Sequence, residues 1–88
     1  IVCGNDLIAV GAISRLNEKG IKIPEQMKVM GFDDIYFSRY MSPPLSTVRQ
    51  PAYEMGAESA KMLIEHLENG IPLYNKKLDF SLIMRGTV

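Results

Sequence analysis

The sequence lacks several features that would restrict it to particular classes of protein. Its 88 residues include one cysteine and no tryptophan. A single cysteine excludes an internal disulfide bond, so a reducing compartment is compatible with the chain. Ten basic residues balance ten acidic residues, and this zero net charge argues against DNA binding by the segment itself, because phosphate contacts require a basic surface. No apolar run approaches the roughly 20 residues that span a bilayer.

Motifs for enzymatic chemistry are equally scarce. His66 is the single histidine and has no metal-ligand spacing around it, so we expect a solvated helical residue. Gly4 and Gly11 do not complete the glycine fingerprint of a dinucleotide-binding turn. Asp33 and Asp34 are adjacent, so their side chains should diverge rather than form an acid–base pair. We therefore predict no enzymatic activity, no metal and no cofactor.

The residues that are present indicate a globular α/β chain. Apolar residues make up 47% and charged residues 23%, a balance that excludes intrinsic disorder. An apolar run at residues 1–3, which includes Cys3 as a core residue, precedes a helical stripe, and a second apolar run follows at residues 27–32. The stripe is formed by Ala9, Ala12, Ile13 and Leu16, and it is widened by Leu7 and Val10. This order predicts a βαβ unit whose helix is buried on more than one side.

The second half of the chain is less regular at first. Residues 35–41 are aromatic-rich and end at Pro43 and Pro44, and residues 45–50 form either a short strand or an extended connection. A second helix is predicted at residues 53–68, with an apolar stripe of Ala60, Leu63, Ile64 and Leu67. Alternation at residues 78–84 predicts a final strand.

Two polar clusters follow the predicted parallel strands, at the positions where open α/β sheets bind ligands. These are Asn5 with Asp6, and Asp33 with Asp34. A carboxylate and an amide suit a ligand with several hydroxyl groups, and Phe32 or a nearby tyrosine offers a flat apolar face. The alternative interpretation is structural, with the first cluster capping a helix and the second starting a turn.

Several segments together resemble the LacI/GalR family of bacterial transcriptional regulators. The match covers nearly the whole chain and is most specific where a Gly-Phe-Asp-Asp strand precedes Pro-Pro-Leu-Ser-Thr. Ser46 is one departure, because the family usually has threonine there, but both residues carry a hydroxyl. The matching segments are Gly4-Asn5-Asp6, residues 29–34, residues 43–51, Met55-Gly56 and residues 82–85.

The resemblance implies an α/β fold that is part of a two-lobed, type I periplasmic-binding-protein-like domain, with a parallel sheet flanked by helices. Residues 1–50 and 79–88 would belong to the C-terminal lobe, and residues 51–78 to the N-terminal lobe. Crossings between the lobes are expected near residues 49–52 and 77–80. Because the chain opens at Ile1 without a methionine, we expect a C-terminal fragment of the sensor domain that lacks the helix-turn-helix headpiece.

The resemblance also implies a function for particular residues. Asp33 and Asn5 would bind a small effector in the cleft between the lobes, a sugar rather than a purine. The dimer interface of a homodimer would include Val10, Tyr36, Tyr40 and Met41. The protein would be a cytoplasmic repressor that contacts operator DNA through its missing headpiece and is controlled allosterically by the effector.

A second hypothesis is an exported sugar-binding protein of the same fold that serves a transporter. A headpiece or a signal peptide at the N-terminus of the full-length protein would distinguish the two. The identity of the effector stays open.

Overall fold

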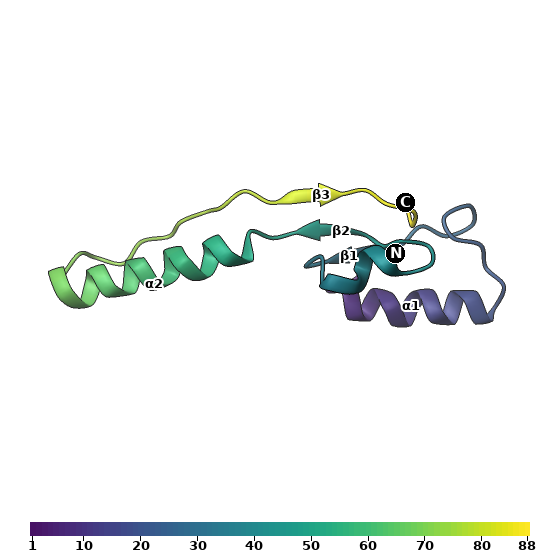
Figure 1. Ribbon diagram of the computed structural model, residues 1–88, viewed down its shortest axis with the longest axis horizontal. Helices are drawn as coiled ribbons and strands as arrows, with labels where there is room; N and C mark the ends of the chain where they lie inside the picture. Colours follow the sequence, from purple (N-terminus) through teal and green to yellow (C-terminus); the bar gives the residue numbers. More distant parts are fainter. The chain divides into compact units, whose positions relative to one another are not determined.

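The computed structural model describes every residue from Ile1 to Val88. The chain forms two compact units, the first made of Ile1–Gln50 and Ser81–Val88, the second of Pro51–Phe80. Neither helix combines the length and apolar character that crossing a membrane demands. Along the chain, the elements are α1 (Asp6–Glu18), β1 (Met30–Phe32), a 3₁₀ helix (Tyr36–Tyr40), β2 (Ser46–Arg49), α2 (Ala52–Asn69) and β3 (Ser81–Ile83) (Figure 1).

The first unit contains a three-stranded mixed sheet in the order β1-β2-β3. β1 and β2 are parallel, with Met30 opposite Ser46 and Phe32 opposite Val48. β3 pairs with β2 in the antiparallel direction and is shorter than the strand predicted at residues 78–84. Before α1, Val2 forms a parallel bridge with Met30. The predicted α/β class is confirmed, and the carboxyl ends of the parallel segments meet at one edge of the sheet.

Helix α1 begins after a polar cap, and a glycine follows its C-terminal end. The side chain of Asn5 accepts a hydrogen bond from the Ile8 backbone N–H at 2.8 Å, which satisfies one of the free donors of the first turn. After the last turn, Gly20 has a φ of 69°, a left-handed conformation that glycine adopts without a steric penalty.

Only one face of α1 is buried, which corrects the expectation of a helix covered on several sides. Ala9 and Ile13 are buried, whereas Leu7 is 63% exposed and Ile8 56%. The reason is geometric, because the sheet packs against a single side of α1 (Figure 1).

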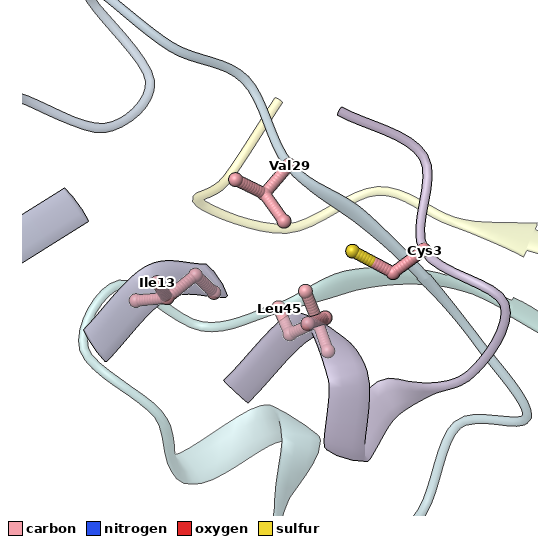
Figure 2. Close-up of a cluster of buried hydrophobic side chains, with 5 residues drawn as sticks. Cys3, Ile13, Val29 and Leu45 are labelled. Carbon is pink, nitrogen blue, oxygen red and sulfur yellow. The ribbon is translucent and has the colours of Figure 1, made fainter. Parts of the chain in front are cut away.

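The core of the first unit is small. It consists of Cys3, Ala9, Ile13, Val29 and Leu45, which come from the opening segment, α1 and the approaches to β1 and β2 (Figure 2). Cys3 is 5% exposed, as predicted for a core residue. Each fully buried aliphatic side chain contributes about 1.5–3 kcal/mol to the stability of the fold. Because this core contains so few of them, polar contacts have a substantial role in holding the unit together.

The second unit consists of α2 and the segment that follows it. Helix α2 extends one residue beyond each predicted end and is closed by Gly70, whose φ is 65°. Lys76 contacts Glu58 at 2.6 Å, and this contact lowers the pKa of Glu58 and raises that of Lys76. No residue of α2 is buried, so its apolar stripe is uncovered within this chain.

The two units divide between residues 50 and 51 and between residues 80 and 81. The assignment of each unit to a lobe stays a prediction.

Gly31 provides a test of how tightly the first unit is packed. A Cβ at this position would overlap the Asp6 carboxyl oxygen and come within 2.9 Å of Leu45 Cδ2. We predict that Gly31→Ala lowers the free energy of unfolding by about 2–3 kcal/mol through overpacking, as measured by urea denaturation.

Gly56→Ala in α2 is the matched control. A Cβ at Gly56 meets no atom within 4 Å, so alanine should stabilise the helix by about 0.5–1 kcal/mol. Equal effects of the two substitutions would contradict the packing interpretation of Gly31.

Candidate functional site

The registers of the sheet place the predicted ligand-binding residues at one edge. Val2 is bridged to Met30 in parallel, so Asn5 and Asp33 each lie three residues past a paired position. The Asp33 backbone N–H donates to the Val48 carbonyl at 2.8 Å and continues the pairing of β1 with β2. Asn5 and Asp33 therefore share an edge of the sheet, without a hydrogen bond between them.

The turn after β1 has an unusual backbone. Asp33 has a φ of 111° and Asp34 a φ of 57°. A residue with a side chain pays about 1–3 kcal/mol in such sparsely populated conformations, which persist only where surrounding contacts enforce them and which cluster at functional sites. Both the conformation and its position at the end of a parallel strand make this turn the centre of the candidate site.

The side chains of the two aspartates diverge, as predicted. Asp33 is exposed, and its Oδ1 accepts a hydrogen bond from Gln50 Nε2 at 2.6 Å. The Asp34 side chain is only 2% exposed and lies between two arginines. Phe32 precedes this turn with 37% of its surface exposed.

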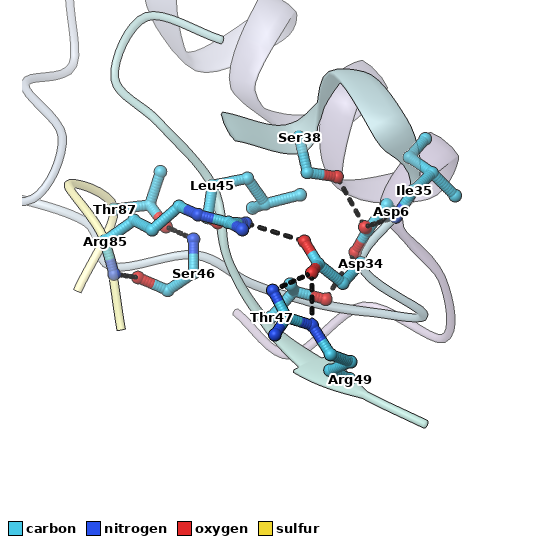
Figure 3. A network of polar contacts seen from close by, with 10 residues as sticks. All are labelled: Asp6, Asp34, Ile35, Ser38, Leu45, Ser46, Thr47, Arg49, Arg85 and Thr87. Carbon is cyan, nitrogen blue, oxygen red and sulfur yellow. Dashed lines mark hydrogen bonds and ion pairs between the residues drawn. The ribbon is translucent and has the colours of Figure 1, made fainter. Parts of the chain in front are cut away.

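Asp34 forms an ion-paired cluster with Arg49 and Arg85 (Figure 3). Arg49 contacts Asp34 Oδ2 through both Nε and Nη2, each at 2.7 Å. Arg85 Nη1 lies 2.8 Å from Asp34 Oδ1, but it is aligned to donate to the Leu45 carbonyl, at 2.9 Å. The Arg85 contact with the carboxylate is therefore an ion pair without an aligned hydrogen bond. Sequence reasoning missed this cluster because its members are distant in the chain.

The arginines determine the titration of Asp34. Burial by itself raises the pKa of this carboxyl, but the close contacts and charges of Arg85 and Arg49 outweigh it and hold the pKa below its ordinary value. A carboxyl whose pKa is lower in the folded state stabilises the fold above its unfolded pKa, which is about 4. That stabilisation is lost as the pH falls through the folded pKa.

The pH dependence of unfolding tests this cluster. We predict that Asp34→Asn lowers stability at neutral pH and flattens the loss of stability below about pH 4, because the substituted side chain no longer titrates. Urea denaturation at a series of pH values would measure this, with Asp79→Asn, an exposed carboxyl, as the control. An acid slope for Asp34→Asn identical to that of the wild-type protein would contradict the assignment.

A second buried carboxyl, that of Asp6, connects three segments of the first unit. Its Oδ2 accepts from the Ile35 backbone N–H at 2.9 Å and from Ser38 Oγ at 2.5 Å, and its Oδ1 accepts from Thr47 Oγ1 at 2.6 Å (Figure 3). Sequence reasoning offered a helix cap as the structural role of this residue, but the cap is Asn5 and Asp6 is fully buried. No local signal could reveal this role, because its partners are 29 to 41 residues away.

Ser46 shows why either hydroxyl residue is tolerated at its position. Its Oγ accepts from the Arg85 backbone N–H at 2.7 Å, and its own N–H donates to Thr87 Oγ1 at 2.8 Å. A threonine also supplies such a hydroxyl oxygen, so the departure from the family pattern leaves this contact available.

The residues predicted for a dimer interface differ in exposure. Tyr36 is 76% and Tyr40 67% exposed, and their ring centroids lie 5.6 Å apart at an angle of 56°. Val10 is half-buried in α1, and Met41 is half-buried against the core.

His66 is exposed, as expected. The chain has no cluster of three or more metal-ligating side chains.

A parallel strand pair with a helix on one face and polar side chains at its carboxyl ends is typical of α/β ligand-binding domains. Residues 1–88 match the family model of the periplasmic binding protein-like domain. The chain therefore belongs to this family, and it corresponds to part of the effector-binding domain of LacI/GalR regulators. The resemblance seen in the sequence is confirmed.

Curated relatives agree with this assignment. The chain is 40% identical over 93 residues to the HTH-type transcriptional repressor PurR of Haemophilus influenzae (strain PittEE), covering 100% of this chain and 27% of the relative. It is 34% identical over 88 residues to the HTH-type transcriptional repressor CytR of Escherichia coli (strain K12), covering 99% and 26%. The chain thus spans about a quarter of the length of these relatives.

Solved structures show the same fold. A putative LacI transcriptional regulator from Bacillus cereus subsp. cytotoxis NVH 391-98 has a TM-score of 0.94 and 34% identity, with 100% of this chain and 32% of that chain covered. A LacI family regulator from Lactobacillus casei with bound sucrose has a TM-score of 0.84 and 32% identity, with 99% and 32% covered.

Proposed function

We propose that this segment is part of the effector-sensing domain of a bacterial transcriptional repressor. Two relatives are named as HTH-type transcriptional repressors. On this proposal operator DNA is bound by a headpiece outside the segment, and the zero net charge of the segment supports this. Effector binding changes DNA affinity if the effector binds one arrangement of the domain more tightly than another. The protein is cytoplasmic on this proposal.

The observation that carries the proposal is the Asp33 carboxylate, exposed at the carboxyl end of β1 on a left-handed backbone. Its Oδ1 is occupied by Gln50, whereas its Oδ2 makes no hydrogen bond within the chain. An exposed carboxylate oxygen of this kind accepts hydrogen bonds from ligand hydroxyl or ring N–H groups.

Asn5 and Phe32 complete the proposed site. The Asn5 Oδ1 caps α1, which leaves the Nδ2 group to donate to a ligand oxygen, so capping and ligand binding are compatible in one residue. Phe32 offers a partly exposed aromatic face. We propose a sugar-like effector rather than a purine, and the bound sucrose in the related Lactobacillus casei structure supports this choice.

The repressor is proposed to act as a homodimer. Two exposed tyrosines, Tyr36 and Tyr40, form an aromatic pair on the 3₁₀ helix, and exposed aromatic residues are enriched at protein interfaces. Val10 and Met41 are the half-buried members of the proposed interface.

An exported sugar-binding protein of the same fold is the alternative, and the names of the relatives favour the repressor. The two proposals differ at the N-terminus of the full-length protein. Mass spectrometry of the protein purified from its native cells would show a retained helix-turn-helix headpiece or a cleaved signal peptide.

Effector titration tests the role of Asp33. In the full-length protein, calorimetry with D-ribose, D-galactose, sucrose, guanine and hypoxanthine would identify a ligand. We predict that Asp33→Ala then weakens its binding by about 2 kcal/mol or more, the scale of a charge-assisted hydrogen bond. Asn5→Ala should cost about 1 kcal/mol, because the bond of a neutral amide is weaker.

Asp79→Ala, which removes an exposed carboxylate of the second unit, is the control and should bind as the wild-type protein does. Wild-type affinity in a folded Asp33→Ala variant would overturn the assignment of the site.

A further inference from the structure

We propose that Asp34 is a positioning residue for Asp33. Its ion pairs with Arg49 and Arg85 hold the turn after β1 in the left-handed conformation that presents the Asp33 carboxylate. The consequence for effector binding rests on the proposed function, in which Asp33 contacts the effector. The effect on the backbone of the turn is independent of that function.

The first reason is that the turn needs an external constraint. Two successive residues with side chains have positive φ values, 111° at Asp33 and 57° at Asp34, where glycine is the residue normally found. The Asp33 side chain is poorly suited to enforce this conformation, because it is exposed and held by a single neutral amide. The Asp34 side chain is nearly buried and held by two cationic groups.

The second reason is that both arginines are anchored to the sheet through their backbones. Arg49 is the last residue of β2, and its guanidinium contacts one Asp34 oxygen through two nitrogens. The Arg85 side chain is 14% exposed and donates to the Leu45 carbonyl, and its backbone N–H donates to Ser46 Oγ. Asp34 therefore binds one guanidinium that Leu45 also holds, that of Arg85, and one that extends from the end of β2, that of Arg49.

The third reason is the pairing between the turn and the end of β2. Asp34 pairs with Arg49, and Asp33 pairs with the next residue, Gln50. The Asp33 N–H is also bonded to Val48. Three successive residues, Val48 and Arg49 of β2 and Gln50 directly after it, thus hold the turn, and the only charged one is Arg49, which contacts Asp34.

Removing the Asp34 charge should therefore release the turn. Two guanidinium groups would then face each other without a shared carboxylate, which is unfavourable for the largely buried Arg85. The Asp33 backbone would keep its hydrogen bond to Val48 but lose the charged contacts beside it, and we expect it to return to a negative φ.

Crystal structures of full-length variants test the effect on the backbone without any ligand. We expect Asp33 to have a negative φ in Asp34→Ala and in Asp34→Asn, and to keep its positive φ in the control Asp79→Asn. A folded Asp34→Ala protein in which Asp33 keeps a φ near 111° would overturn the proposal.

If Asp34→Ala fails to fold, the half-exposed Arg49 supplies the deciding pair of variants. Arg49→Met removes the charge at similar length and should release the turn, whereas Arg49→Lys keeps the charge and should retain it. A positive Asp33 φ in both variants would count against the proposal.

Binding measurements separate positioning from a general structural role. The ligand is sucrose, or another of the five compounds titrated above if that one binds the wild-type protein. When Asp33 is present, Asp34→Asn should weaken its binding about tenfold or more. In an Asp33→Ala background it should weaken binding less than about twofold, because coupled residues are not additive. Equal losses in both backgrounds would overturn the positioning role.

The two proposals can fail separately. Wild-type affinity in Asp33→Ala, or no binding by any of the five compounds, would count against the proposed function. The φ of Asp33 in the Asp34 and Arg49 variants would still decide whether Asp34 holds the turn.

Discussion

The buried carboxyl group of Asp6 is the contact on which the arrangement of the first unit depends. It lies in the first turn of α1, where the helix dipole favours an acidic residue. Its three hydrogen-bond donors come from the segment after β1, the 3₁₀ helix and β2. Breaking this set would leave buried donors unsatisfied in segments that the small apolar core alone holds weakly. The same carboxyl group occupies the space that a Cβ at position 31 would need, and the residue there is glycine.

The Asp6 carboxyl group also restricts the backbone conformation of the turn that carries the candidate site. Asp33 is bonded to Val48 at the end of the sheet, and Ile35 is bonded to Asp6 two residues later. The backbone must therefore reverse within Asp33 and Asp34 between two fixed points, and on our proposal the Asp34 ion pairs hold it in the two positive φ values with which it does so. The Asp34 ion pairs lie at the middle of this span. The packing of α1 on the sheet and the geometry of the site are thus parts of one set of contacts.

Local patterns in the sequence predicted the elements well and the long-range contacts poorly. The Asn5 cap, the burial of Cys3 and the extent of α2 depend on neighbouring residues, so spacing and residue type were sufficient. The edge of the sheet shared by Asn5 and Asp33 also followed from the order of the elements. The roles of Asp6 and Asp34 depend on partners that are at least 15 residues away, at registers that only the folded sheet defines. The breadth of the apolar face of α1 was overestimated because an apolar residue can be exposed as well as buried.

Three aspartates lie close to the carboxyl ends of the strands, and their surroundings separate their roles. Asp6 accepts hydrogen bonds on both oxygens from groups of its own unit, and both oxygens of Asp34 face arginines. Neither has an exposed oxygen for a further partner. Asp33 is exposed, and it uses one oxygen for Gln50 while the other makes no hydrogen bond within the chain. The three residues are chemically identical, and their roles differ because of their partners within the chain. Only the Asp33 carboxylate retains an acceptor oxygen that a ligand can use.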